Sequence, residues 1–282
     1  MSVILGIDIG GSTTKIVGLR GNGDPIAMRR VQAQDPITSL YGALGNFLFT
    51  NGLELGDVSR IALTGVGSSF VKGDIYGIPT EKVEEFTAVG VGGLALSGQD
   101  RAVVVSMGTG TAFIWAERGR EVRHLCGSGV GGGTLAGLCS RLCGTRQYDQ
   151  IVKLAAGGDV ANIDLSVGDI TQNAPPSLPL DITAANFGQV SDAATPGDFA
   201  AGVINMVLQS IGTTAVMACR AQNCDTVVLT GFMSTLPQAE DCFALFTRLH
   251  GIRFLIPQNA TFATSIGAAL CVSEHDRQEA RP

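Results

Sequence analysis

The chain has 282 residues, which is enough for two domains of ordinary size, each with a core of its own. Its composition is 45% hydrophobic and only 16% charged, which excludes an intrinsically disordered protein. The net charge is −6 and the basic residues are scattered along the sequence, so we expect no nucleic acid among the main partners.

Targeting signals and cysteines point to a cytoplasmic protein. No apolar stretch approaches the roughly 18 residues of a membrane-spanning helix, and we find no signal peptide, so we expect no membrane partner. The seven cysteines are odd in number and include no pair at Cys-x-x-Cys spacing. This pattern favours free thiols in a reducing compartment over a disulfide framework or a zinc site.

The first fifteen residues predict a phosphate-binding hairpin. Val3–Ile7 forms a buried strand, Asp8 follows it, and Thr14–Leu19 is the returning strand. The turn between them exposes backbone N–H groups and carries hydroxyl and ammonium donors, and Asp8 can hold a Mg²⁺ that bridges phosphates. The residues expected to surround the phosphates are Gly10, Gly11, Ser12, Thr13 and Lys15.

The next segment completes a first α/β unit. We predict a strand over Ile26–Gln32, a helix over Pro36–Asn51 and a short strand over Arg60–Thr64. This β-β-β-α-β order is the one expected of half of an actin-like nucleotide-binding fold.

Two adjacent acids, Glu84 and Glu85, precede a helix of small residues that ends near Gly98. A carboxylate beside apolar surface is a candidate general base, because partial desolvation raises its pKa. Composition alone favours the other interpretation, in which both acids cap the helix N-terminus.

A second hairpin over Ala102–Ala116 repeats the design of the first, with Ser106 at the end of its leading strand. Its turn contains Gly108, Thr109, Gly110 and Thr111. Two such hairpins about a hundred residues apart indicate an internal duplication, and together they would grip a triphosphate across a cleft.

A strand over Glu121–Leu125 leads into a glycine-rich loop, Gly127–Gly133, and a helix that runs to about Leu142. A glycine loop at a helix N-terminus is a candidate anion site, and a flexible connection is the alternative. Cys126 lies beside this loop.

The remaining elements complete a second unit. Residues 157–180 differ in composition from the rest of the chain, with pairs of glycines and prolines, and predict an extended excursion. The residues alone indicate no chemical role for Asp181–Gly188. The helix over Phe199–Arg220 is apolar on several faces and is expected in the core or at a subunit interface. The other predicted elements are a helix over Tyr148–Ala156, a strand over Thr226–Thr230 that ends at Gly231, a helix over Gln238–Leu249, a strand over Phe254–Ile256 and a closing helix over Ala263–Val272.

These motifs together resemble the actin-like ATPases and sugar kinases, and within them the type II pantothenate kinases. The likeness rests on Glu85 with Phe86, on the Gly-Gly-Gly-Thr run at 131–134, and on Asp181–Gly188. It implies an α/β fold of two actin-like, ribonuclease H-like domains of mixed sheets with flanking helices around a nucleotide cleft. We place the domains at 1–100 and 101–282, with the last helix packing back toward the cleft.

The resemblance implies phosphorylation of pantothenate by ATP with Mg²⁺, the first step toward coenzyme A. Glu85 would take the proton from the primary hydroxyl, and Asp8 would organise the metal. A homodimer is expected, and coenzyme A or acetyl-CoA is a candidate feedback ligand. Residues expected at the nucleotide are Gly10, Gly11, Ser12, Thr13, Lys15, Gly108, Thr109, Gly110, Gly132, Gly133, Thr134, Tyr148 and Gly231, with Thr109 also at the substrate.

One position departs from the family. Where the family has a substrate-binding arginine on the strand before the glycine-rich loop, this chain has His124, preceded by Arg123. Neighbours on a strand face opposite sides, so only one of the two is expected to reach the substrate.

Three other functions compete with this hypothesis. An ATP-driven iron–sulfur activator of acyl-CoA dehydratases has a similar opening hairpin, and Cys126 would be a cluster ligand in a dimer. A sugar or N-acetylhexosamine kinase would normally carry an aspartate base that this chain lacks. A non-catalytic actin-like protein would have lost the base, which the presence of Glu85 opposes.

Overall fold

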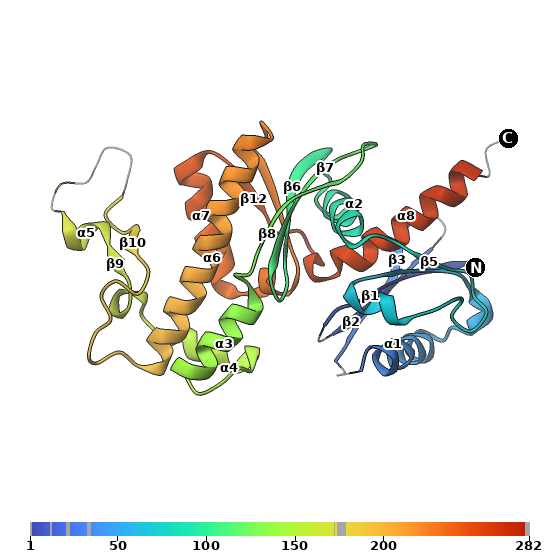
Figure 1. Ribbon diagram of the computed structural model, residues 1–282, viewed down its shortest axis with the longest axis horizontal. Coiled ribbons are helices and arrows are strands. Elements are labelled where there is room, and N and C mark those ends of the chain that lie inside the picture. The colour runs from blue at the N-terminus through green and yellow to red at the C-terminus, as the bar shows by residue number, and fades with distance from the viewer. Residues whose placement is uncertain are drawn as a thin grey trace.

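The computed structural model describes residues 2–11, 13–20, 23–32, 35–171, 173 and 179–279, without the side chains of 274–279. Its first sheet has the strand order β3-β2-β1-β4-β5 (Figure 1). The first three strands form an antiparallel meander, and β4 and β5 add to it in parallel. The strands are β1 (Val3–Ile9), β2 (Thr14–Arg20), β3 (Pro25–Val31), β4 (Val58–Thr64) and β5 (Thr80–Lys82).

The second sheet repeats this topology with the order β8-β7-β6-β11-β12. Again three antiparallel strands come first and two parallel strands are added beside the leading one. The predicted duplication therefore describes the whole architecture, with the two glycine hairpins in equivalent places. The strands are β6 (Arg101–Met107), β7 (Thr111–Glu117), β8 (Arg123–Ser128), β11 (Thr226–Thr230) and β12 (Arg253–Leu255).

Two helices of small residues pack against each other between the sheets (Figure 1). Helix α2 (Glu85–Ser97) covers the second sheet, and helix α8 (Ala263–Glu279) covers the first. Glycines allow the close approach, since a Cβ at Gly92 would collide with the carbonyl of Ala263 and one at Gly267 with the carbonyl of Ala88. The last helix thus returns to the first sheet, as expected, and the division at residue 100 stays a prediction.

The outer face of each sheet carries its own helices. Helix α1 (Pro36–Asn51) packs on the first sheet, where Phe47 is fully buried. On the second sheet lies the core formed with α3 (Gly132–Leu142), α4 (Tyr148–Ala155), α6 (Pro196–Ala221) and α7 (Pro237–His250).

Helix α6 corrects one expectation from the sequence. By length and mean hydropathy it is able to span a membrane, although no such stretch was predicted. Most of its apolar residues are buried against the second sheet and α7, so the core accounts for its composition.

The excursion before α6 contains short elements and projects from the α6 side of the second sheet (Figure 1). They are the 3₁₀ helix η3 (Val160–Asn162), β9 (Leu165–Ser166), α5 (Val167–Ile170) and β10 (Thr183–Ala185). The buried carboxylate of Asp164 fastens it by accepting hydrogen bonds from Asn186 Nδ2 (3.1 Å), Phe187 N (2.8 Å) and Asn205 Nδ2 (2.7 Å). The stretch Asp181–Gly188 therefore ties the excursion to α6.

Candidate active site

The first hairpin joins β1 to β2 and brings Asp8 and Lys15 together. These residues are paired across the two strands, and Lys15 Nζ lies 3.2 Å from Asp8 Oδ2. The amide of Gly10 closes the turn by donating to the carbonyl of Thr13 at 2.9 Å. A Cβ at Gly11 would meet no atom, so this part of the turn is open to a ligand. Ser12 lies outside the described residues.

The second hairpin and the glycine-rich loop form one unit. The amide of Gly132 donates to the carbonyl of Gly108 at 2.9 Å, and that of Gly133 donates to Thr109 at 2.8 Å. Thr134 Oγ1 caps the start of α3 by accepting from the amide of Gly131 at 3.2 Å. These predicted phosphate-binding residues are therefore held together, with the amides of Gly132 and Gly133 directed to the hairpin.

The same unit also explains its own glycines. A Cβ at Gly131 would lie 2.8 Å from the carbonyl oxygen of Thr109, and Gly110 accepts a hydrogen bond from the amide of Gly108 at 2.9 Å. A side chain at Gly131, Gly132 or Gly133 would push α3 away from the hairpin, whereas a Cβ at Gly129 would meet no atom. Packing therefore requires glycine at 131–133, and the loop stays a candidate anion site.

Gly231 and Tyr148 are connected through Phe232. Gly231 follows β11 with a φ of +88°, and a Cβ there would lie 2.5 Å from the carbonyl oxygen of Met107. The next residue, Phe232, contacts the Tyr148 ring at a centroid distance of 4.4 Å. The Tyr148 hydroxyl shares a hydrogen bond of 3.0 Å with Thr235, and burial raises its pKa.

Glu84 and Glu85 have different environments. Glu84 is exposed and caps α2, accepting from the amides of Phe86 at 3.0 Å and Thr87 at 2.7 Å. Glu85 stands in the first turn of α2 and is partly buried. Burial raises its pKa most, followed by the negative charges of Asp8 and Glu84, while Lys15 opposes the shift. Glu85 is thus a desolvated carboxyl within electrostatic reach of the first hairpin.

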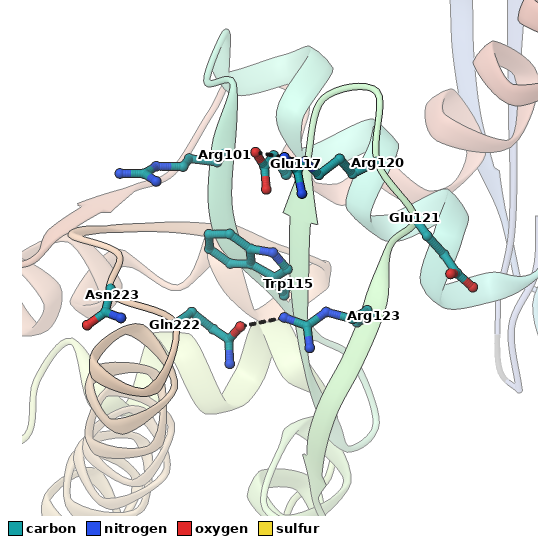
Figure 2. Close-up of a pocket in the computed structure, with 8 residues that line it drawn as sticks. All are labelled: Arg101, Trp115, Glu117, Arg120, Glu121, Arg123, Gln222 and Asn223. Atoms are coloured by element: carbon teal, nitrogen blue, oxygen red, sulfur yellow. Dashed lines mark hydrogen bonds and ion pairs between the residues drawn. The ribbon is translucent and has the colours of Figure 1, made fainter.

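Arg123 and His124 leave β8 on opposite faces. His124 pairs with Ile114 and stacks on Phe86, which follows Glu85. Arg123 pairs with Trp115 and donates to Gln222 Oε1 at 2.6 Å, in a hollow on the other face of the sheet (Figure 2). That hollow is lined by Arg101, Trp115, Glu117, Arg120, Glu121, Arg123, Gln222 and Asn223.

The surroundings of Asp8 fit a divalent cation. Asp8 is buried, and the neighbouring strand residue Thr64 has a buried hydroxyl that no group in the described part of the chain bonds. Gly65 approaches so closely that a Cβ there would lie 2.5 Å from Asp8 Oδ1. One carboxylate with a nearby hydroxyl matches Mg²⁺, which takes few protein ligands and completes its shell with water and phosphate oxygens.

Cys126 is exposed on β8. Across the described residues of this chain, no group of three or more His, Cys, Asp or Glu side chains could hold a metal ion. A cluster shared between two subunits, which the activator hypothesis requires, remains a hypothesis.

Solved structures confirm the fold class. Component A of the (R)-2-hydroxyglutaryl-CoA dehydratase of Acidaminococcus fermentans matches with a TM-score of 0.70 and 16% identity, over 98% of this chain and 100% of that one. A glucokinase of the ROK family from Streptomyces griseus, in complex with glucose and AMPPNP, matches with a TM-score of 0.62 and 14% identity, over 95% and 98% of the two chains. At these identities the likeness establishes the architecture alone.

Sequence comparisons are more specific. The family model described as Fumble matches residues 102–248. The type II pantothenate kinase of Staphylococcus aureus (strain USA300) is 31% identical over 278 residues, covering 94% of this chain and 97% of the relative. On this likeness over nearly its whole length, the chain belongs to the type II pantothenate kinase family.

Proposed function

We propose that this kinase transfers the γ-phosphoryl group of ATP to the primary hydroxyl of pantothenate, giving ADP and 4′-phosphopantothenate. Family membership supports the reaction. The observation that carries it is the position of Glu85, a partly buried acid within electrostatic reach of Asp8 and Lys15. An acid of raised pKa within electrostatic reach of the proposed phosphate-binding hairpin is suited to accept a proton from an alcohol.

In this mechanism the carboxylate of Glu85 takes the hydroxyl proton as the alcohol oxygen bonds to the γ-phosphorus. The bond from that phosphorus to the oxygen bridging the β- and γ-phosphates breaks, and its electron pair leaves with ADP. Lys15 and the backbone of the first hairpin stabilise the negative charge on the transferring group. Asp8 would hold Mg²⁺, which supplies neutralisation of phosphate charge when it is bound.

For the acceptor we propose His124 as a binding residue. It projects to the α2 face of the second sheet and stacks on Phe86, next to the proposed base. Arg123 bonds Gln222 on the opposite face, so it is the weaker candidate. Thr109 would contact the transferring phosphate from the second hairpin, near the acceptor oxygen.

Three finer features remain part of the proposal: a homodimer, inhibition by coenzyme A or acetyl-CoA, and a cytoplasmic location where ATP is supplied. The apolar surface of α6 gives no separate support for the dimer, because most of it is buried within the chain. Sedimentation of the purified protein and a rate assay with added acetyl-CoA would test the first two.

The decisive experiment is ATP consumption with pantothenate against a panel of hexoses and N-acetylhexosamines, with Mg²⁺ present. We expect turnover with pantothenate, a product phosphorylated on its primary hydroxyl, and background rates with the sugars. Turnover with a sugar and none with pantothenate would contradict the proposal. Brown protein after anaerobic purification, with no kinase activity, would favour the iron–sulfur activator.

A further inference from the structure

A row of three charged residues crosses the first sheet. Asp8, Lys15 and Arg30 are paired in register across β1, β2 and β3. Residues directly opposite each other in antiparallel strands project from the same face. Their neighbours on that face, Ile4 and Val17, pack against α8, so the row faces the space between the two sheets.

The third member of this row reaches the second sheet. The guanidinium carbon of Arg30 lies 4.2 Å from the centroid of the Phe232 ring. Phe232 follows Gly231 and contacts Tyr148, and both of these residues are expected at the nucleotide. The contact with Phe232 therefore places Arg30 next to the expected nucleotide site. The positive charge of Arg30 also acts on Tyr148. It lowers the pKa of the Tyr148 hydroxyl, although burial has the larger effect and raises that pKa.

The charges in the row are not equally compensated. Lys15 shares its charge with Asp8 at 3.2 Å. In the described part of the chain, no carboxylate forms an ion pair with Arg30, although the residue is oriented by its contact with Phe232. Among the described residues, Arg30 is therefore a cation without a carboxylate partner, and it stands between the Phe232–Tyr148 pair and Lys15.

The order of groups along the row matches the order of groups in a nucleoside triphosphate. Phe232 and Tyr148 offer aromatic surface at one end. Asp8, which lies within electrostatic reach of the proposed base Glu85, marks the proposed reacting end. Adjacent strands lie about 5 Å apart, so Arg30 stands one strand farther from the reacting end than Lys15. A ligand along this line would place the start of its phosphate chain beside Arg30.

We propose that Arg30 is a nucleotide-binding residue, whose guanidinium stacks on Phe232 and bonds the α-phosphate of the nucleotide. Arginine suits both contacts, because its planar group stacks on aromatic rings and pairs with phosphate through two parallel N–H groups. The inference rests on the kinase function and is independent of the identity of the acceptor.

The test is calorimetric titration with MgADP in the absence of any acceptor. We expect Arg30→Ala to weaken ADP binding by about 10- to 100-fold, the range of a charged hydrogen bond, and Arg30→Lys to recover part of the loss. Adenosine lacks the phosphate, so we expect its affinity, measured in a competition assay, to fall less than threefold in Arg30→Ala. With ATP and pantothenate, KM for ATP should rise while kcat and KM for pantothenate stay unchanged.

Arg29 provides the matched control. It is exposed on the same strand, carries the same charge and projects from the opposite face of the sheet. Arg29→Ala should leave ADP affinity within about twofold of the unmodified protein. Arg30 is exposed on the edge strand, so we expect all three variants to fold, with thermal melting as the check.

Three results would overturn the inference: unchanged ADP affinity in Arg30→Ala, equal losses in Arg29→Ala and Arg30→Ala, or tighter binding in Arg30→Ala. The last would mean that the Arg30–Phe232 contact opposes nucleotide entry. These outcomes can be distinguished from a failure of the proposed kinase function. A protein that binds ADP through Arg30 and leaves pantothenate unmodified would refute only the acceptor, and one that phosphorylates pantothenate with Arg30→Ala unimpaired would refute only this inference.

Discussion

The imidazole of His124 lies flat on the ring of Phe86, with centroids 4.3 Å apart and planes inclined by 13°. Phe86 directly follows the proposed base, Glu85, on α2, and His124 stands on β8. The stack therefore ties the strand of the proposed acceptor residue to the helix of the proposed base.

This contact leads to a prediction about acceptor binding. His124→Ala should raise KM for pantothenate by up to about tenfold, the value of one neutral hydrogen bond, and leave KM for ATP unchanged. Arg123→Ala is the matched control and should change both constants less than twofold, because Arg123 bonds Gln222 on the other face. Equal effects of the two substitutions on KM for pantothenate would refute the assignment of His124.

The proposed base can be tested by an isosteric change. Glu85→Gln should leave ATP affinity intact and lower kcat by about 10²- to 10⁴-fold, the usual contribution of a general base. Glu84→Gln keeps an oxygen for the helix cap and should retain most of the rate. Single-turnover kinetics with calorimetric ATP binding would measure both, and a near-normal rate in Glu85→Gln would move the role to Glu84.

The pH profile follows from the direction of the Glu85 pKa. Because burial, Asp8 and Glu84 raise it above 4.5, the carboxyl becomes protonated and inactive at a higher pH than an ordinary glutamate. The acid limb of kcat/KM for pantothenate should therefore lie above pH 4.5. Glu84→Gln removes one of the negative charges and should move that limb to lower pH, whereas a shift to higher pH would contradict the assignment.

The interface between α2 and α8 predicts a loss of stability. Gly267→Ala places a methyl group against the carbonyl of Ala88 and should cost about 1–3 kcal/mol or more in the free energy of unfolding. Gly45→Ala is the control, because a Cβ there meets no atom on an exposed helix position and should stabilise by roughly 0.5–1 kcal/mol. Urea unfolding of both variants measures the difference, and a neutral Gly267→Ala would show that the helices can separate slightly.

Acid unfolding should depend on Asp198, at the start of α6. Its carboxylate accepts from the amides of Asp159 at 2.7 Å and Thr195 at 2.8 Å, which lowers its pKa from 3.8 to about 2. A lowered pKa stabilises the fold above pH 3.8, and this contribution is lost as the pH falls toward 2. Asp198→Asn should be less stable at pH 7 and lose less stability between pH 4 and 2, as measured by urea unfolding at each pH. A steeper loss than in the unmodified protein would contradict this account.

Much of the fold follows from local patterns in the sequence. The two glycine hairpins, the long helices and the duplication were predicted, because apolar strands around a glycine turn and helical spacing are encoded locally. The strand β5, which spans only Thr80–Lys82, and the small elements of the excursion were missed. Elements this short have little periodicity, and the strands among them form only by pairing with another strand in the folded chain.

The site was predictable only in part. Glu84 and Glu85 are adjacent in the sequence, and the sequence does not distinguish their roles. Only the folded chain shows that Glu84 caps α2 and that Glu85 lies within electrostatic reach of Asp8. Arg30 was missed altogether, because its significance depends on strand register and on Phe232, some two hundred residues away. The pleat predicted that Arg123 and His124 diverge, but which one faces α2 required the register of β8.

The exchange of α2 and α8 between the sheets has a consequence for biosynthesis. A ribosome makes the first sheet early, yet Ile4 and Val17 stay uncovered until Ile266 and Ala269 of α8 have left the exit tunnel. Cutting the chain after residue 100 would leave α2 with the first sheet and α8 with the second, although each helix covers the other sheet. The two halves are thus complementary pieces, expected to be insoluble when made singly and to reassemble when produced together.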